Sequence, residues 1–148
     1  MSLTFRDATR ADVPAIIALL RDDQFGRTRE TSEMDHYLAA FDRLSGETGN
    51  TVVVGELGGR IVATFQIAFL SGLSLRATRR AQIESVRVAA DLRGQGIGRA
   101  MMAEAEARAR HAGCGLLQLT THAERNRARD FYEGLDYSPS HVGFKREL

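Results

Sequence analysis

The sequence predicts a mixed-sheet α/β fold (α+β by some definitions), in which helices pack on a mostly antiparallel sheet. Two observations carry this prediction: strand-like runs form a hairpin, and a strand–helix–strand crossover follows. The length of 148 residues, without repeats or Pro/Ser-rich linkers, fits a single domain over residues 1–148. Apolar residues make up 43% of the chain, which is enough for a buried core.

The first third of the chain is typical of one strand and two helices. Residues 3–6 have a short strand pattern, and the pair Thr9 and Asp12 resembles a capping box. Apolar residues then recur at helical spacing as far as Leu20. After a polar stretch without any period, a second helical stripe covers residues 34–44.

The remaining two thirds alternate between strands and helices. A strong two-residue hairpin signal, Gly58-Gly59, joins the first two strand-like runs. The later helices show helical spacing or a glycine stop, and the strands are rich in β-branched and aromatic residues. The predicted elements are strands at 51–57, 60–70 and 81–90, a helix at 97–113, a strand at 115–121, a helix at 127–135 and a closing strand at 142–148.

Three glycines and two arginines mark the junction between the third of these strands and the long helix. The segment reads Arg93-Gly94-Gln95-Gly96-Ile97-Gly98-Arg99. Glycines let backbone N–H groups approach an oxyanion, and a helix N-terminus adds partial positive charge. The dinucleotide fingerprint fails because positions 99 and 101 are not glycine, and the P-loop fails because no Lys-Ser or Lys-Thr occurs. The pattern that remains is R-x-x-G-x-G.

On these residues the chain resembles the GNAT superfamily of acetyl-CoA-dependent N-acetyltransferases, which carries [Q/R]-x-x-G-x-[G/A] at this junction. The preceding strand IESVRV and the downstream Ala128-x-x-Phe131-Tyr132-Glu133 also match the family. The resemblance implies a sheet of about six to seven strands with helices on both faces. It also implies a splayed parallel strand pair that holds the cofactor.

The resemblance implies acetyl-CoA as co-substrate. The histidines lack a metal-ligand spacing such as H-x-x-x-H, so we expect no metal. The pantetheine arm would pair with the main chain of Val86 and Val88 like an added strand, and the Val88 N–H would also face the carbonyl oxygen of the acetyl group. Many relatives have asparagine where this chain has Arg125, so Asn126, one residue further on, is assigned a cofactor contact. The pyrophosphate would lie on the segment that includes Arg93, Gly94, Gln95, Gly96, Ile97, Gly98 and Arg99.

Two residues are candidates for proton transfer. By resemblance, Tyr132 donates a proton to the departing thiolate, while the alternative is an aromatic side chain that only packs beside Phe131. Glu84 is the carboxylate inside an otherwise apolar strand, so we expect it to be partly buried and to act as the base, directly or through a water. The alternative for Glu84 is an ion pair with Arg79 or Arg80.

One departure from the family concerns the turn after the last helix. Relatives have L-G-[FY] there, whereas this chain has Leu135-Asp136-Tyr137. Aspartate tolerates the left-handed backbone conformation that a helix end needs, so we expect the turn to be retained.

The predicted function is transfer of the acetyl group of acetyl-CoA to an amine of an unidentified small molecule, peptide or protein. The alternative is a non-catalytic, acyl-CoA-binding regulatory module. The net charge of +1 argues against nucleic-acid binding, although Arg125, Arg127 and Arg129 form a local cluster. The chain lacks a membrane-length apolar run and a signal-peptide pattern, so we expect a cytoplasmic protein without a membrane partner. A homodimer is an open alternative.

Overall fold

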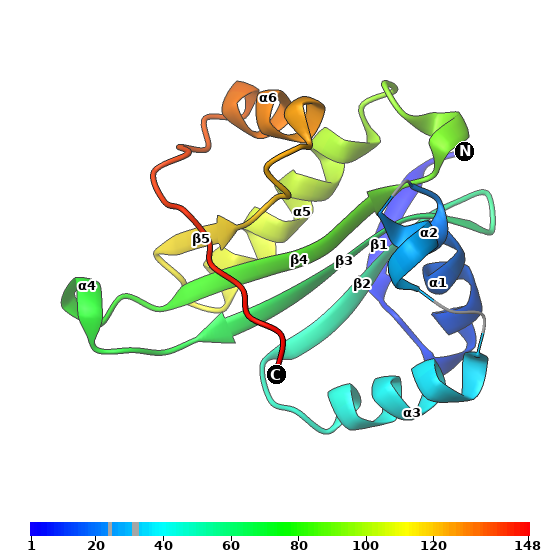
Figure 1. Ribbon diagram of the computed structural model, residues 1–148, viewed down its shortest axis with the longest axis horizontal. Helices are drawn as coiled ribbons and strands as arrows, with labels where there is room; N and C mark the ends of the chain where they lie inside the picture. The colour runs from blue at the N-terminus through cyan, green and yellow to red at the C-terminus, as the bar shows by residue number, and fades with distance from the viewer. Residues whose placement is uncertain (24, 31–32) are drawn as a thin grey trace. The chain divides into compact units, whose positions relative to one another are not determined.

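The computed structural model describes residues 1–23, 25–30 and 33–148. The chain divides into two compact units, Met1–Gln118 and Leu119–Leu148, whose elements are labelled in Figure 1. The single domain predicted over residues 1–148 stays a prediction.

The first unit is built on a five-stranded sheet in the order β1-β2-β3-β4-β5. Neighbouring strands from β1 to β4 are antiparallel, and β4 and β5 are parallel. The predicted hairpin is confirmed, because Gly58 and Gly59 join β2 to β3 with φ angles of 57° and 79°, as a two-residue turn requires. The strands are β1 (Leu3–Asp7), β2 (Asn50–Leu57), β3 (Arg60–Leu70), β4 (Arg80–Val88) and β5 (Leu116–Leu119).

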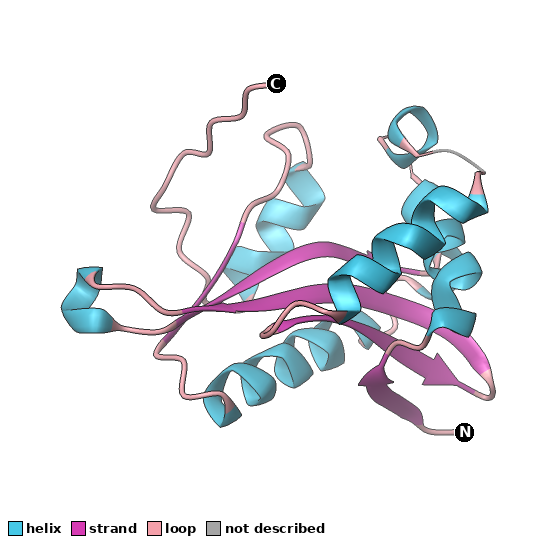
Figure 2. Ribbon diagram, turned by 90° about the horizontal axis from the view of Figure 1, so that it is seen from below, coloured by secondary structure: helices cyan, strands magenta, loops and turns pink. Residues whose placement is uncertain are grey.

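Helices cover both sides of this sheet (Figure 2). Helix α1 packs against β3 and β4, and α5 packs against β1, β3 and β4. The helices are α1 (Val13–Arg21), α2 (Gly26–Arg29), α3 (Met34–Ser45), α4 (Ser74–Ala77) and α5 (Ile97–His111), with 3₁₀ turns η1 (Arg10–Asp12) and η2 (Ala90–Leu92).

The three long helices of this unit are confirmed, whereas the two short ones, α2 and α4, were not predicted. Each short helix has four residues, which is too few to show a helical period in the sequence. Of the polar stretch between α1 and α3, Gln24, Thr31 and Ser32 lie outside the described residues. In the described part of the chain, we find no helix that is both long and apolar enough to cross a membrane.

The core of the first unit lies between the sheet and the helices. The apolar face of α5 is buried at Ile97, Met101 and Ala105. In β3, Phe65 and Ile67 are buried, each with 1% of its surface exposed. Thr64 is also only 1% exposed, and its hydroxyl donates a hydrogen bond to the Val53 carbonyl at 3.0 Å. The middle of β3 is therefore covered on both faces.

The second unit contains one helix, α6 (Asn126–Gly134), which confirms the predicted last helix. The chain turns after it through Asp136, whose φ angle of 67° is the left-handed conformation expected there. The Tyr137 N–H donates to the Tyr132 carbonyl at 3.0 Å and closes this turn.

The predicted closing strand at 142–148 is wrong, because residues 138–148 form neither helix nor strand. The sheet has five strands instead of six to seven. Val142 and Phe144 have strand-like alternation, yet they are 79% and 93% exposed. Alternation creates an apolar face, but a strand also needs a paired edge for its backbone groups, and Pro139 just before it has no N–H to offer.

A buried carboxylate joins β1 to the start of α1. Asp12 accepts hydrogen bonds from two Arg6 nitrogens, Nη1 at 2.7 Å and Nη2 at 3.0 Å. It also accepts from the Thr9 backbone N–H at 2.7 Å, which confirms the predicted capping pair. The hydrogen bonds from Arg6, assisted by those from Thr9, lower the pKa of Asp12 to about 2.

This pKa predicts that Asp12 stabilises the fold above pH 4 and loses that contribution as the pH falls toward 2. A group with a depressed folded-state pKa stabilises the protein only while it is ionised. We expect Asp12→Ala to lower the free energy of unfolding at pH 7 by roughly 1–2 kcal/mol, and by less at pH 2.5. Urea denaturation at the two pH values measures both quantities.

Asp42→Ala is the matched control. Its ion pair with Arg10 has side chains that are 55% and 59% exposed, so we expect a change below about 0.5 kcal/mol. An equal loss for Asp12→Ala at both pH values would contradict the assignment of this stabilisation to the Asp12 charge.

Candidate functional site

The glycine loop between η2 and α5 adopts a conformation that favours glycine. Gly94 and Gly96 have φ angles of 75° and 87°, and Gly96 is the N-cap of α5. A Cβ atom added at either position would meet no atom within 4 Å. Backbone conformation, and not packing within the chain, is therefore what requires glycine at these two positions.

The same loop presents a continuous row of backbone donors. Within the described residues, none of the backbone N–H groups from Gly94 to Arg99 donates to a protein acceptor. The first hydrogen bond of the helix runs from the Ala100 N–H to the Gly96 carbonyl at 3.1 Å. Consecutive unpaired N–H groups at a helix N-terminus form a seat for an anion such as a phosphate.

The two arginines that flank the glycines have different surroundings. Arg93 donates from Nε to the Val88 carbonyl at 3.2 Å and from Nη2 to the Asp22 carbonyl at 3.3 Å. It therefore ties the loop to the end of β4 and to the residue after α1. Arg99 is exposed in the first turn of α5, where its charge adds to that of the helix terminus.

Strand β4 contains a β-bulge before it reaches this loop. Gln66 of β3 pairs with Glu84, and Thr64 pairs with Arg87, so Phe65 faces two residues of β4, Ser85 and Val86. Ser85 has a φ angle of 55°, which is uncommon for a residue with a side chain. The extra residue changes the direction of the strand at this point.

Beyond the bulge, the main chain of β4 faces the side of β5. The Ala89 N–H donates to the Val62 carbonyl of β3 at 2.8 Å. Because successive residues of a strand point their backbone N–H and C=O groups to opposite sides, those groups of Val88 and Val86 point away from β3. Consistent with this, arginine side chains bind both carbonyls: Nη1 of Arg87 is 2.8 Å from the Val86 oxygen, and Nε of Arg93 is 3.2 Å from the Val88 oxygen.

The neighbouring strand β5 lies beside the first half of β4. The Gly115 N–H donates to the Arg79 carbonyl at 2.9 Å, and Gln118 donates to Gln82 at 2.8 Å. Since β5 has four residues and β4 has nine, the second half of β4 has no strand of the described sheet on that side. An extended ligand could therefore pair with the backbone of Val86 and Val88.

An ion pair anchors the segment after α1 to β4. Nε of Arg87 lies 3.1 Å from Oδ2 of Asp23, and each side chain is 13% exposed. The other oxygen of Asp23 accepts hydrogen bonds from the backbone N–H groups of Phe25 at 3.0 Å and Gly26 at 2.5 Å. Asp23 thus links β4 to the backbone at Phe25 and Gly26.

Glu84 is exposed, so the expectation that it is partly buried is wrong. Ala81 and Ile83 point into the core, and the strand alternation turns Glu84 to the opposite face. Within the described residues, Glu84 makes no side-chain hydrogen bond or ion pair. The predicted alternative partner Arg79 instead donates to the Ala112 carbonyl at 2.8 Å.

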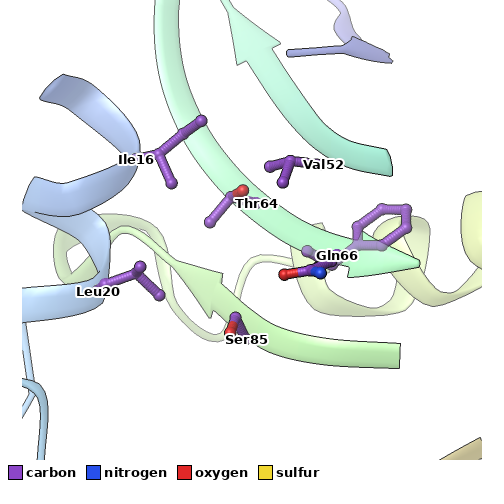
Figure 3. A pocket seen from close by; sticks show the side chains of 7 residues that line it. Ile16, Leu20, Val52, Thr64, Gln66 and Ser85 are labelled. Atoms are coloured by element: carbon purple, nitrogen blue, oxygen red, sulfur yellow. The ribbon is translucent and has the colours of Figure 1, made fainter. Parts of the chain in front are cut away.

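A small pocket of about 70 Å³ lies beside the bulge, between α1 and the sheet (Figure 3). Most of its lining is apolar, with polar groups from Thr64, Gln66 and Ser85. The sequence did not predict this pocket, because neither Gln66 nor Ser85 stands in a motif that indicates a binding site. The lining residues are Ile16 and Leu20 of α1, Val52 of β2, 64–66 of β3 and Ser85 of β4.

The second unit carries the two remaining candidates, both in α6. Tyr132 is half-buried and makes edge-to-face ring contacts with Phe131, at a centroid distance of 5.1 Å, and with Tyr137, at 5.9 Å. These contacts are compatible with the packing role as well as with the catalytic one. Asn126 is exposed at the first position of the helix. In the described part of the chain, no group of three or more His, Cys, Asp or Glu side chains is arranged to hold a metal ion.

Comparison with known proteins places these features in a family. The sequence matches the acetyltransferase (GNAT) family over residues 14–137. An aminoalkylphosphonate N-acetyltransferase from Salmonella typhimurium is 39% identical over 67 residues, which cover 45% of this chain and 44% of that protein. The match therefore spans less than half the length of this curated relative.

Two solved structures share the fold over nearly the whole chain. A transcriptional regulator from Bacillus halodurans has a TM-score of 0.94 and 37% identity, and covers 99% of this chain and 100% of its own. A putative acetyltransferase from Agrobacterium tumefaciens has a TM-score of 0.84 and 25% identity, with coverage of 98% and 99%. Because the family match extends from α1 to just beyond α6, this protein belongs to the acetyltransferase (GNAT) family.

Proposed function

We propose that this protein transfers the acetyl group of acetyl-CoA to a primary amine of a small molecule. The observation that carries the proposal is the row of unpaired N–H donors from Gly94 to Arg99 at the start of α5, in a chain of this family. Such a row fits the pyrophosphate of coenzyme A, because a pyrophosphate is bound by hydrogen-bond donors and positive charge.

Acetyl-CoA supplies a thioester carbonyl that an amine can attack, forming a C–N bond while the C–S bond breaks. The chain has to place this carbonyl, remove a proton from the nitrogen and deliver a proton to the thiolate. The N–H groups of Val86 and Val88 hold the pantetheine arm and the carbonyl oxygen, on the edge of β4 that has no neighbouring strand. Asn126 is a further contact to the cofactor.

Glu84 accepts the proton of the attacking nitrogen, directly or through one water. Its exposure leaves it open to solvent and to an incoming amine, and it has no competing ion pair within the described residues. Tyr132 donates its phenolic proton to the thiolate and is reprotonated from solvent. The ring contacts with Phe131 and Tyr137 hold its side chain in one orientation.

The pocket beside the bulge receives the substrate amine. Its apolar lining from α1 and β2 suits a carbon chain, and Gln66, one of the lining residues, is the cross-strand partner of Glu84. The name of the Salmonella relative supports a small amine that also carries an anion. We therefore choose 2-aminoethylphosphonate as the first test substrate.

A thiol-release assay tests this function. We expect acetyl-CoA to release free thiol in the presence of 2-aminoethylphosphonate, and more slowly with a lysine-containing peptide or a peptide with a free N-terminus. Binding of acetyl-CoA in calorimetry without thiol release from any of the three amines would instead favour the regulatory alternative. Absence of binding at millimolar acetyl-CoA would contradict both.

The loop geometry predicts a specific effect of Gly96→Ala. The new methyl group would meet no protein atom, so it stands only in the way of a ligand. We expect the Kd for acetyl-CoA in calorimetry to rise at least about tenfold, a loss of about 1.4 kcal/mol. The left-handed backbone should also lower the free energy of unfolding by roughly 1 kcal/mol.

Gly113→Ala is the control for this strain, because Gly113 lies past the other end of α5. It has a φ angle of 78° and also has no atom within 4 Å of an added Cβ. We expect a similar loss of stability with an unchanged Kd. Equal weakening of acetyl-CoA binding by both variants would assign the effect to strain alone.

The proposed proton transfers predict that Tyr132→Phe and Glu84→Gln respond differently to pH. Each variant should lower kcat at pH 7 by roughly 100-fold with little change in KM. At pH 9.5 more of the amine is neutral in solution, so the Glu84→Gln rate should recover toward that of the parent protein, while the Tyr132→Phe rate should not. A kcat equal to that of the parent at both pH values would remove the residue concerned from its role.

A further inference from the structure

A chain of three side chains fixes the orientation of the Gln66 amide. Nδ2 of Asn50 donates to Oε2 of Glu47 at 2.7 Å, and Nε2 of Gln66 donates to Oδ1 of Asn50 at 2.9 Å. A carboxylate accepts hydrogen bonds and donates none, so the amide nitrogen of Asn50 must face Glu47 and its oxygen must face Gln66. The Gln66 amide therefore uses its nitrogen for Asn50 and turns its oxygen the other way.

The oxygen of Gln66 faces the pocket beside the bulge. Gln66 lines this pocket, and Figure 3 shows its oxygen on the side of Ser85 and Leu20, with its nitrogen on the far side. No donor reaches this oxygen within the described residues. Thr64, the other polar residue of β3 in the lining, already donates its hydroxyl hydrogen to the Val53 carbonyl at 3.0 Å.

A second hydrogen-bond acceptor stands next to Gln66. Gln66 and Glu84 are direct partners across β3 and β4, so their side chains lie on the same face of the sheet. Glu84 is exposed and Gln66 is half-buried, so the carboxylate is the more solvent-accessible of these two acceptors. A group that binds between them must supply hydrogen-bond donors, as an amino group does.

The size and lining of the pocket limit what else can enter with that group. A volume of about 70 Å³ is well below the roughly 300–1,000 Å³ of pockets that enclose a whole drug-sized ligand, so only one end of a substrate enters it. Ile16 and Leu20 of α1 lie across the pocket from the sheet (Figure 3), and Val52 is the cross-strand partner of Gln66. An unbranched aminomethyl end (CH₂–NH₂) has two heavy atoms, one apolar and one polar, and fits this space and lining.

We propose that Gln66 is the specificity-determining residue that positions the substrate amine, by accepting a hydrogen bond from an unbranched aminomethyl group. The hydrogen bonds that Asn50 donates to Glu47 and accepts from Gln66 hold the Gln66 oxygen toward the pocket, and Glu84 takes the proton of the substrate nitrogen. This inference rests on the proposed acetyltransferase function and identifies its substrate class. An amine on a branched carbon places an additional methyl group or backbone against the apolar lining and is a poorer substrate.

The test uses steady-state kinetics with whichever of the three amines above releases thiol fastest. We expect Gln66→Leu to raise the KM for the amine about tenfold, because one hydrogen bond to a charged or reacting group is lost. The KM for acetyl-CoA and its Kd in calorimetry should not change. Asn50→Leu keeps Gln66 but removes the hydrogen bond that orients its amide, so we expect the KM for the amine to rise about threefold.

Gln82→Leu is the matched control, since it makes the same exchange at another half-buried glutamine that does not line the pocket. It should leave both KM values unchanged. An unaltered KM for the amine in Gln66→Leu, with thiol release intact, would overturn the role of Gln66 while leaving the acetyltransferase function standing. Failure of all three amines to release thiol would overturn both.

The substrate class has its own readout. If the amine nitrogen enters the pocket on an unbranched carbon, the parent protein should acetylate 2-aminoethylphosphonate or a lysine side chain at least tenfold faster, in kcat/KM, than the N-terminus of a peptide that begins with alanine, whose amine is on a branched carbon. A faster reaction at the peptide N-terminus would contradict the aminomethyl assignment.

Discussion

The arrangement of the candidate site depends on the pairing of β3 with β4 and on the single extra residue that interrupts it. Up to Glu84 the two strands are in regular register, which sets Glu84 beside Gln66 on one face. The bulge at Ser85 and Val86 then shifts the ladder by one residue. A left-handed φ angle at Ser85 costs on the order of 1–3 kcal/mol, so the regular pairs on either side of the bulge must hold it in place.

Two arginine side chains bind backbone carbonyls of β4 at and just beyond the bulge. Beyond it, Val86 and Val88 turn their main chain away from β3, and Arg87 and Arg93 occupy the two carbonyls. The N–H groups of these valines are thereby the backbone groups left for a ligand on that edge. Arg93 also reaches the Asp22 carbonyl, so one guanidinium links the strand, the glycine loop and the end of α1. A residue expected to meet phosphate thus also holds the loop together.

The parts of this molecule that could be predicted from sequence are those set by local periodicity and by special backbone conformations. The hairpin at Gly58-Gly59, the long helix from Ile97 and the left-handed turn at Asp136 all have local causes. The bulge at Ser85 has none, because the register of two strands decides it. The exposure of Glu84 and the hydrogen bonds that join residues 47, 50 and 66 also have no local cause in the sequence. The missing closing strand shows the converse: alternation at Val142 and Phe144 does not create a partner for their backbone.

The glycine loop proposed to bind pyrophosphate and the pocket proposed to bind the amine are both ordered before a ligand binds, but by different groups. Gly94 and Gly96 already hold left-handed conformations within the chain, so the ordering cost of the donor row is met on folding and not on binding. The Gln66 oxygen is likewise fixed by hydrogen bonds that involve only protein groups. The glycine loop would bind the cofactor through backbone groups, which side-chain substitutions in the pocket do not change. The pocket would bind the amine through side chains. We therefore expect substrate preference to change through residues such as Gln66 and Asn50 without loss of acetyl-CoA binding.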